Sequence, residues 1–196
     1  MSDTSNYIAQ YSQDMVDACA GTGLFPSVMM AQGILESGNG KSGLAAKYNN
    51  QFGIKCECTV CPCYVSGMFV SMTSTEYDKN NNPYSQVSKF KTYRTPFDSF
   101  VDRVAFLKKY PRYTNAGVFT ATTPQEQTQA LQDAGYATSQ TYAAELNKLI
   151  SDWNLEQLDS MKPNSMRFTT QTWVLAAISG VALSLSLFLY FKYMKK

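Results

Sequence analysis

Glu36 is the acidic residue whose surroundings in the sequence point most directly to proton transfer. Val28, Ala31 and Leu35 precede it at helical spacing, and Gly38 follows as a helix breaker. A carboxylate in a last helical turn meets the negative end of the helix dipole, and an apolar face beside it offers little water. Both effects raise the pKa of a carboxyl group, which can then give a proton to a leaving-group oxygen near neutral pH. Glu36 is therefore predicted to be a general acid, with a solvated helix end as the alternative.

The overall composition excludes several other chemistries. The chain of 196 residues contains no histidine, so Ser-His pairs, Cys-His pairs and histidine-based metal sites are absent. Of its 17 basic residues, Lys192, Lys195 and Lys196 lie at the carboxyl end, which leaves 14 against 15 acidic residues in the rest of the chain. This balance gives no electrostatic footprint for nucleic acid, and no cofactor is implied.

The elements that must position Glu36 can be read from periodicity, proline and glycine. Helices are predicted over residues 7–20, 27–36, 42–48, 95–110, 123–135 and 142–155. Two β-rich runs, 65–77 and 84–93, flank a turn cluster and predict a hairpin. The expected fold class is α+β: a mostly helical domain with one β-hairpin.

A series of motifs in this order resembles one family of wall-cleaving enzymes. Phe25-Pro26 comes first, Glu-Ser-Gly-Asn-Gly-Lys-Ser covers residues 36–42, and Asn-Asn-Gln-Phe-Gly-Ile-Lys covers residues 49–55. The run resembles the flagellar-type endo-β-N-acetylglucosaminidases, glycoside hydrolase family 73, and the resemblance extends over roughly residues 25–153. It implies a lysozyme-like fold and cleavage of bacterial peptidoglycan.

A glycosidase usually needs a second carboxyl group across the scissile bond. In the family that the chain resembles, a Thr-Glu or Thr-x-Glu motif on the hairpin supplies it, and Thr75-Glu76 matches that motif. Glu76 is therefore the predicted second catalytic residue, with Asp78 and Glu57 as rivals. A separation of roughly 6.5–9.5 Å would give inversion and about 5 Å a covalent intermediate, whereas the substrate's own N-acetyl group would need no close second carboxylate.

Three aromatic residues are predicted to contact the substrate: Phe52, Tyr113 and Tyr136. Tyr113 belongs to an Arg-Tyr motif that resembles the family's, and a phenol there can hydrogen-bond a sugar or the catalytic carboxyl group. Tyr136 belongs to a Gly-Tyr-Ala-Thr motif, which the family usually continues with Asp. Ser139 stands in that position here, which puts in doubt any contact that the Asp makes, although Tyr142 fits the pattern.

Four cysteines, Cys56, Cys58, Cys61 and Cys63, form a cluster that the family pattern does not require. Four thiolates could bind zinc, but Cys-x-Cys pairs are closer than the usual ligand spacing. Disulfides or free thiols are therefore expected rather than a metal site. Cys19 is expected in the core.

The carboxyl-terminal segment predicts a membrane anchor. Residues 168–191 carry no charge, and residues 173–190, almost wholly apolar, would span roughly 27 Å as a helix. Trp173 at one end and Tyr190 at the other resemble interfacial anchors. The expected organisation is a catalytic domain over residues 1–158, a linker over 159–167, and a transmembrane helix with a short basic tail over 168–196. A buried core helix is the alternative.

The lysines after this segment outnumber the basic residues just before it, which favours a cytoplasmic carboxyl terminus. Residues 1–7 contain no basic region followed by an apolar core, so no secretory signal is expected. A bacteriophage protein, carried in a virion membrane or released at lysis, would reconcile these features. A tail-anchored hydrolase of the host is the alternative.

These features together predict a membrane-tethered peptidoglycan hydrolase that cleaves the β-1,4 bond between N-acetylglucosamine and N-acetylmuramic acid. Its partners would be glycan strands and membrane lipid. A muramidase, a lytic transglycosylase and a non-catalytic glycan-binding module are the competing interpretations, and the sequence predicts neither the oligomeric state nor the bond specificity.

Overall fold

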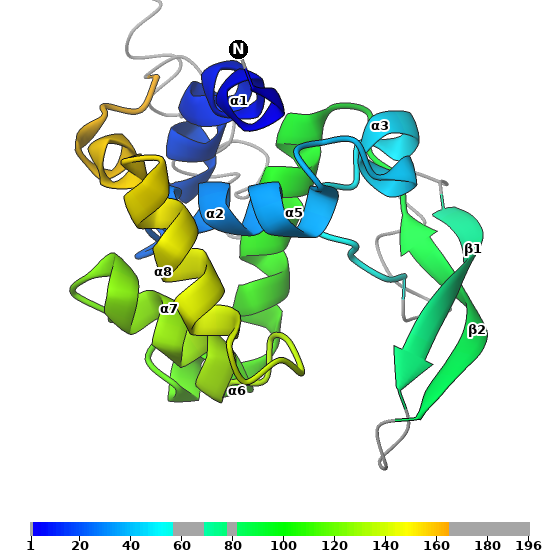
Figure 1. The fold of residues 1–196 in the computed structure, drawn as a ribbon. Helices are drawn as coiled ribbons and strands as arrows, with labels where there is room; N and C mark the ends of the chain where they lie inside the picture. Colours follow the sequence, from blue (N-terminus) through cyan, green and yellow to red (C-terminus); the bar gives the residue numbers. More distant parts are fainter. Residues whose placement is uncertain (1, 57–68, 78–81, 165–196) are drawn as a thin grey trace, which may run out of the picture. The chain divides into compact units, whose positions relative to one another are not determined.

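The computed structural model describes residues 2–56, 69–77 and 82–164, without the side chains of residues 74–77. The chain divides into two compact units, Met1–Met161 and Lys162–Lys196, and the first holds all the helices and strands described. Along the chain these are α1 Asp3–Cys19, α2 Pro26–Ser37, α3 Gly43–Tyr48, β1 Phe69–Tyr77, β2 Pro83–Lys91, α5 Pro96–Lys109, α6 Pro111–Asn115, α7 Pro124–Asp133, α8 Tyr142–Asp152 and the 3-10 helix η1 Leu155–Ser160 (Figure 1).

Short polar residues and glycine set the helix ends. Ser42 accepts a hydrogen bond from a backbone N–H of α3, and Thr123 does the same for α7. Thr95 and Asp98 form a capping box at the start of α5, which also has proline in its first turn. Gly38 ends α2 in the left-handed conformation, with a φ of 57°, so Glu36 lies in the last turn as predicted.

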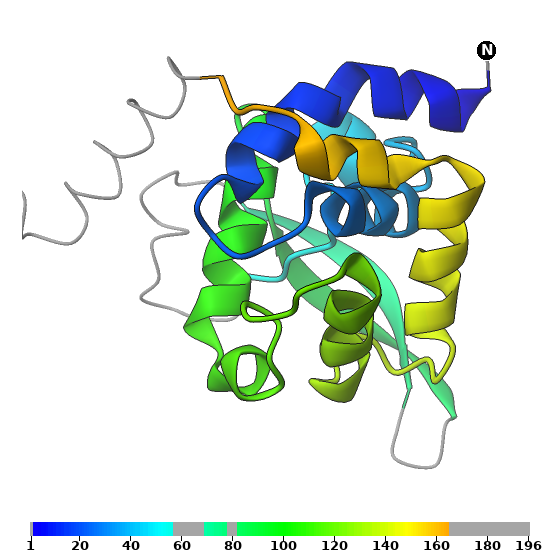
Figure 2. The same cartoon turned by 90° about the vertical axis from the view of Figure 1, so that its left-hand side faces the viewer.

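Helix α2 lies in the middle of the first unit, with α1, α5 and α8 around it (Figure 2). A Cβ atom at Gly33 would lie 2.7 Å from the Tyr7 hydroxyl and 3.0 Å from the Met15 Cε, so glycine allows α1 to approach closely. At the other end of the chain, Asp159 of η1 accepts hydrogen bonds from the backbone N–H (2.8 Å) and hydroxyl (2.7 Å) of Ser27. These contacts fix α2 from its first turn onward.

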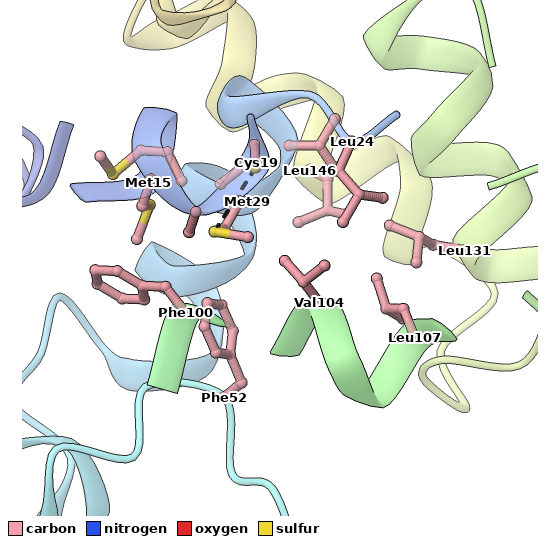
Figure 3. Close-up of a cluster of buried hydrophobic side chains, with 14 of the residues drawn as sticks. Met15, Cys19, Leu24, Met29, Phe52, Phe100, Val104, Leu107, Leu131 and Leu146 are labelled. Carbon is pink, nitrogen blue, oxygen red and sulfur yellow. Dashed lines mark hydrogen bonds between the residues drawn. The ribbon is translucent and has the colours of Figure 1, made fainter. Parts of the chain in front are cut away.

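Apolar side chains from α1, α2, α5, α7 and α8 meet in one core (Figure 3). Its members include Met15, Cys19, Leu24, Met29, Phe52, Phe100, Val104, Leu107, Leu131 and Leu146. The Cys19 thiol lies 3.9 Å from the Met29 sulfur, which confirms Cys19 as a core residue. Burial raises the pKa of this thiol to about 12, so it is an inert, protonated packing group.

Strands β1 and β2 form the predicted antiparallel hairpin, with Phe69 opposite Lys91 and Tyr77 opposite Pro83. The hairpin joins the helices at its base. The Lys91 backbone N–H donates to the Ile54 carbonyl at 3.0 Å, and the Lys91 ammonium lies 2.8 Å from the Asp102 carboxylate. Tyr93 donates to the same carboxylate at 2.7 Å.

The structure corrects three details of the predicted elements. Short helix α6 begins at Pro111, directly after the predicted helix over 95–110, where the sequence predicts no further helix. The predicted helix over 142–155 stops at Asp152, because Asn154 adopts a φ of 48°, and η1 follows. Asp159, expected in the linker, belongs to η1.

Several predictions fall on residues outside the described ranges. They include the segment 168–196, three of the clustered cysteines (Cys58, Cys61 and Cys63), and the rival carboxylates Glu57 and Asp78. Within the ranges that the structure describes, no helix is long and apolar enough to cross a membrane. The same ranges contain no group of three or more Cys, Asp or Glu residues that could hold a metal ion.

Candidate active site

Glu36 is exposed to solvent at the end of α2, yet the protein around its carboxyl group raises its pKa. Desolvation is the largest cause of this shift, and the hydrogen bond from Tyr142 and the charge of Arg103 oppose it. The Tyr142 hydroxyl of α8 donates to the Glu36 Oε1 at 3.1 Å. The structure therefore confirms the predicted direction of the shift and identifies desolvation as its main cause.

A chain of side-chain hydrogen bonds leads from the interior to Glu36. The Arg103 Nη2 of α5 donates to the Gln32 Oε1, and the Gln32 Nε2 donates to the Tyr142 hydroxyl at 2.7 Å. Because Tyr142 accepts from Gln32, its own proton is directed to Glu36. Gln32 lies one helical turn before Glu36 on α2, so the two side chains share a face.

Tyrosine rings extend from this hydrogen-bonded chain. The Tyr136 ring stacks on Tyr142, with centroids 5.6 Å apart and planes at 20°. The centroid of the Tyr113 ring lies 6.2 Å from that of Tyr136. Burial raises the pKa of all three phenols, so each is a neutral hydrogen-bonding group at physiological pH. The Tyr113 hydroxyl accepts a hydrogen bond of 2.8 Å from the Arg112 Nη2.

A cavity of about 310 Å³ lies at the far end of these rings, lined by Phe106, Tyr110, Pro111 and Arg112. The Phe106 ring lies 6.4 Å from Tyr136, edge to face, so the cavity and the Glu36 site share one aromatic wall. The Arg112 guanidinium lies over the Tyr110 ring at 5.8 Å. Aromatic faces beside a guanidinium can pack on sugar rings and bind acidic or hydroxyl groups.

The predicted site residues occupy different environments. Tyr136 is partly buried and joins Glu36 through Tyr142. Tyr113 is fully buried. Phe52 is 5% exposed, which leaves little ring surface for a sugar to contact. Glu76 lies on β1 opposite Tyr84, and its side chain falls outside the part that the structure describes.

Sequence reasoning missed Gln32 and Arg103 and gave Tyr142 no role. A signal existed for Gln32, because residues four apart lie on the same helix face. Arg103 also had a signal, since it lies on the same face of α5 as Phe100, Val104 and Leu107, which form an apolar stripe. The structure shows that this arginine is buried within the stripe.

Comparison with solved structures places the fold in the lysozyme-like class. The catalytic domain of the autolysin Auto from Listeria monocytogenes superposes with a TM-score of 0.70 and 34% identity over 81% of this chain and 89% of that chain. The family model "Glucosaminidase: Mannosyl-glycoprotein endo-beta-N-acetylglucosaminidase" matches residues 12–155. The chain therefore belongs to the glucosaminidase family, glycoside hydrolase family 73, as its motifs predicted.

Two curated relatives support this assignment. The chain is 33% identical to the exo-glucosaminidase LytG of Bacillus subtilis (strain 168) over 149 residues, which is 72% of this chain and 48% of the relative. It is 33% identical to the peptidoglycan hydrolase FlgJ of Escherichia coli (strain K12) over 152 residues, 76% of this chain and 46% of the relative. The chain thus spans about half the length of the curated relatives it matches.

Proposed function

We propose that the protein is a peptidoglycan hydrolase of the N-acetylglucosaminidase type, which cleaves β-1,4 glycan strands of the bacterial wall. Membership of the glucosaminidase family and the names of its relatives support the reaction class. The observation that carries the proposal is Glu36, a solvent-accessible carboxyl group whose pKa is raised and which accepts a hydrogen bond from a buried tyrosine.

In the proposed reaction, protonated Glu36 gives its proton to the glycosidic oxygen. The bond between that oxygen and the anomeric carbon breaks, the bonding electrons leave with the oxygen, and positive charge develops on the sugar. Glu36 is left as a carboxylate, and water then bonds to the anomeric carbon and gives up a proton, to Glu36 if the reaction retains configuration or to Glu76 if it inverts. Glu76 is the proposed second carboxylate, acting as base, nucleophile or electrostatic stabiliser according to its distance from Glu36.

The aromatic wall is the proposed support for the glycan strand. Tyr136 stacks on Tyr142, the hydrogen-bond donor to the acid, and the cavity lined by Tyr110 and Arg112 lies further along the same wall. Tyr113 and Phe52 would act mainly from beneath this surface, because both are buried. Tethering through the apolar segment 168–191 is a further part of the proposal, supported by its sequence alone. A membrane stays the predicted location, with the virion membrane of a bacteriophage as one candidate.

Digestion of purified peptidoglycan by the full chain, with mass analysis of the products, tests the reaction. Products that end in a reducing N-acetylglucosamine are expected. A reducing N-acetylmuramic acid end would instead identify a muramidase, and an anhydro sugar a lytic transglycosylase. No products from the native protein, with glycan binding intact, would favour the binding module.

The matched variants are Glu36→Gln and Glu156→Gln. The first removes the proposed acid. The second removes an exposed carboxylate of η1 to which no part in the reaction is assigned. Lysis should disappear only in Glu36→Gln. Full activity of that variant would overturn the proposed function.

A further inference from the structure

Arg103 is a fully buried arginine of α5 without a carboxylate at ion-pair distance among the residues that the structure describes. Its guanidinium donates to the Gln32 side chain and lies 5.6 Å from the centre of the Phe52 ring. Within the described ranges, its Nε and Nη1 atoms have no hydrogen-bond partner. This is an unusual environment for a cation.

Such a residue is costly for the fold. Removing a cation from water is compensated only by close opposite charge and complete hydrogen bonding, and Arg103 has neither within the described ranges. Its neighbours on the stripe, Phe100, Val104 and Leu107, are apolar and buried. A methionine or leucine at position 103 would pack there without the electrostatic cost. Only a role that needs a positive charge and a planar set of donors accounts for an arginine in this position.

The first such role is to orient the Gln32 amide. A guanidinium has only donors, so it selects the orientation in which the Gln32 carbonyl oxygen faces Arg103. The amide nitrogen then faces Tyr142, and the tyrosine must accept from it. If the amide were reversed, the Gln32 NH2 group would face the Arg103 guanidinium, so that two donors would oppose each other. The Gln32 carbonyl oxygen would then face Tyr142 and compete with Glu36 for its proton. Arg103 thus determines which way the Tyr142 proton points.

The second role is electrostatic. The titratable groups that act on Glu36 are Arg103 of α5, Tyr142 of α8 and Tyr136 of the segment before α8. Tyr7 of α1 also lies against α2, at Gly33, but its hydroxyl donates to Gln51 and not to Glu36. Of these groups only Arg103 carries a positive charge, and it lowers the pKa of Glu36 against the effect of burial.

We propose that Arg103 is a positioning residue for proton donation, an inference that rests on Glu36 being the acid proposed above. Through Gln32 it fixes the Tyr142 hydroxyl as a donor to the Glu36 carboxyl group. Its charge also stabilises the carboxylate that remains after the proton has moved to the glycosidic oxygen. The interior of the helical unit therefore prepares the acid for the ionised state that it reaches during the reaction.

The variant Arg103→Met tests both roles, because methionine has a similar length but no charge and no donors. We expect kcat to fall about 10- to 100-fold with little change in KM. The alkaline limb of the kcat/KM profile should move to higher pH. Loss of the nearby cation raises the pKa of Glu36, so the acid stays protonated up to a higher pH. Arg94→Met is the matched control, since Arg94 is an exposed arginine, and its profile should equal that of the native protein.

Gln32→Glu tests the same proposal with a nearly isosteric change, in case the methionine variant does not fold. The new carboxylate would pair with Arg103 and cancel its charge, so the alkaline limb should again move to higher pH and kcat should fall. An unchanged profile in this variant would overturn the inference while leaving the proposed function intact. Activity in Glu36→Gln would overturn both.

Discussion

Helix α2 and the β1–β2 hairpin carry the two predicted catalytic carboxylates in very different surroundings. Glu36 ends a helix whose other residues are almost all buried, and a hydrogen-bonded chain from the interior reaches it. On β2 only Ser88 and Phe90 are buried, and Val87 is 68% exposed. One carboxylate is supported by the core of the unit, and the other by a two-stranded ribbon.

This difference suggests a division of tasks. An acid must lie within a fraction of an ångström of its target and keep a defined protonation state, which requires buried partners. A two-stranded ribbon is marginal by itself and depends on its attachment, here through Lys91, Tyr93 and Asp102. The helices therefore supply chemical precision, and we expect the hairpin to contribute more to holding the glycan.

The sharpest test of this comparison pairs Glu36→Gln with Glu76→Gln. Glu36→Gln should lower kcat about a thousandfold or more, because it removes the proton donor. If Glu76 only assists a reaction that uses the substrate's N-acetyl group, its variant should lose about tenfold. Steady-state kinetics on a soluble glycan would measure both. Equal losses would show that the hairpin carboxylate is as essential as the helical one.

Tyr142→Phe removes the hydroxyl that donates to Glu36 and keeps the ring that stacks on Tyr136. We expect kcat to fall about 10- to 100-fold, because Glu36 loses its hydrogen-bond donor. The alkaline limb of the pH profile should move upward, since that hydrogen bond lowers the pKa of Glu36. Tyr84→Phe on the hairpin is the control, with a ring that is 47% exposed, and it should leave the profile unchanged.

Asp102→Asn tests the attachment of the hairpin rather than the chemistry. It weakens the hydrogen bonds from Lys91 and Tyr93, which are partly buried, so the free energy of unfolding should fall by about 1–2 kcal/mol. Thermal unfolding measures this change. Asp152→Asn breaks an exposed pair with Lys148 and should cost no more than about 0.5 kcal/mol. A rise in KM without a change in the alkaline limb would fit the division of tasks.

The smallest effect concerns stability and pH. Burial raises the pKa of Glu36 in the folded state, so this group binds its proton more tightly in the folded than in the unfolded chain. Native stability should therefore fall as pH rises from about 4.3, the ordinary value for Glu, through the raised pKa. Glu36→Gln should unfold at the same temperature as the native protein at low pH and at a slightly higher temperature at pH 8. A lower unfolding temperature at pH 8 would contradict the pKa direction.

Local patterns predicted most of the fold and the position of Glu36 in the last turn of its helix. The helical spacing before Glu36, the glycine after it and the alternating runs of the hairpin all act over a few residues, which is the range that a sequence displays directly. The structure confirmed α2, its end at Gly38 and the antiparallel hairpin. The Asn154 kink was harder to foresee, since only one residue leaves the helical conformation there.

The support of the acid could not be predicted, because it depends on contacts between distant parts of the chain. Arg103 and Gln32 are 71 positions apart, and Tyr142 is 106 from Glu36. Phe52 was predicted near substrate from its motif, but its ring packs 6.0 Å from Phe100 in the core. Motifs identify the residues of a site, whereas tertiary packing decides which of them face the solvent.

The contact between Asp159 and Ser27 has a consequence for how the protein can be made. The two residues are separated by 132 positions, so the start of the acid-bearing helix gains its final partner only when the ribosome has produced almost the entire first unit. A version truncated after residue 158 would contain every predicted catalytic residue and still lack the hydrogen bonds between Asp159 and Ser27. Fragments intended for biochemistry should therefore extend past Met161, where the compact unit ends.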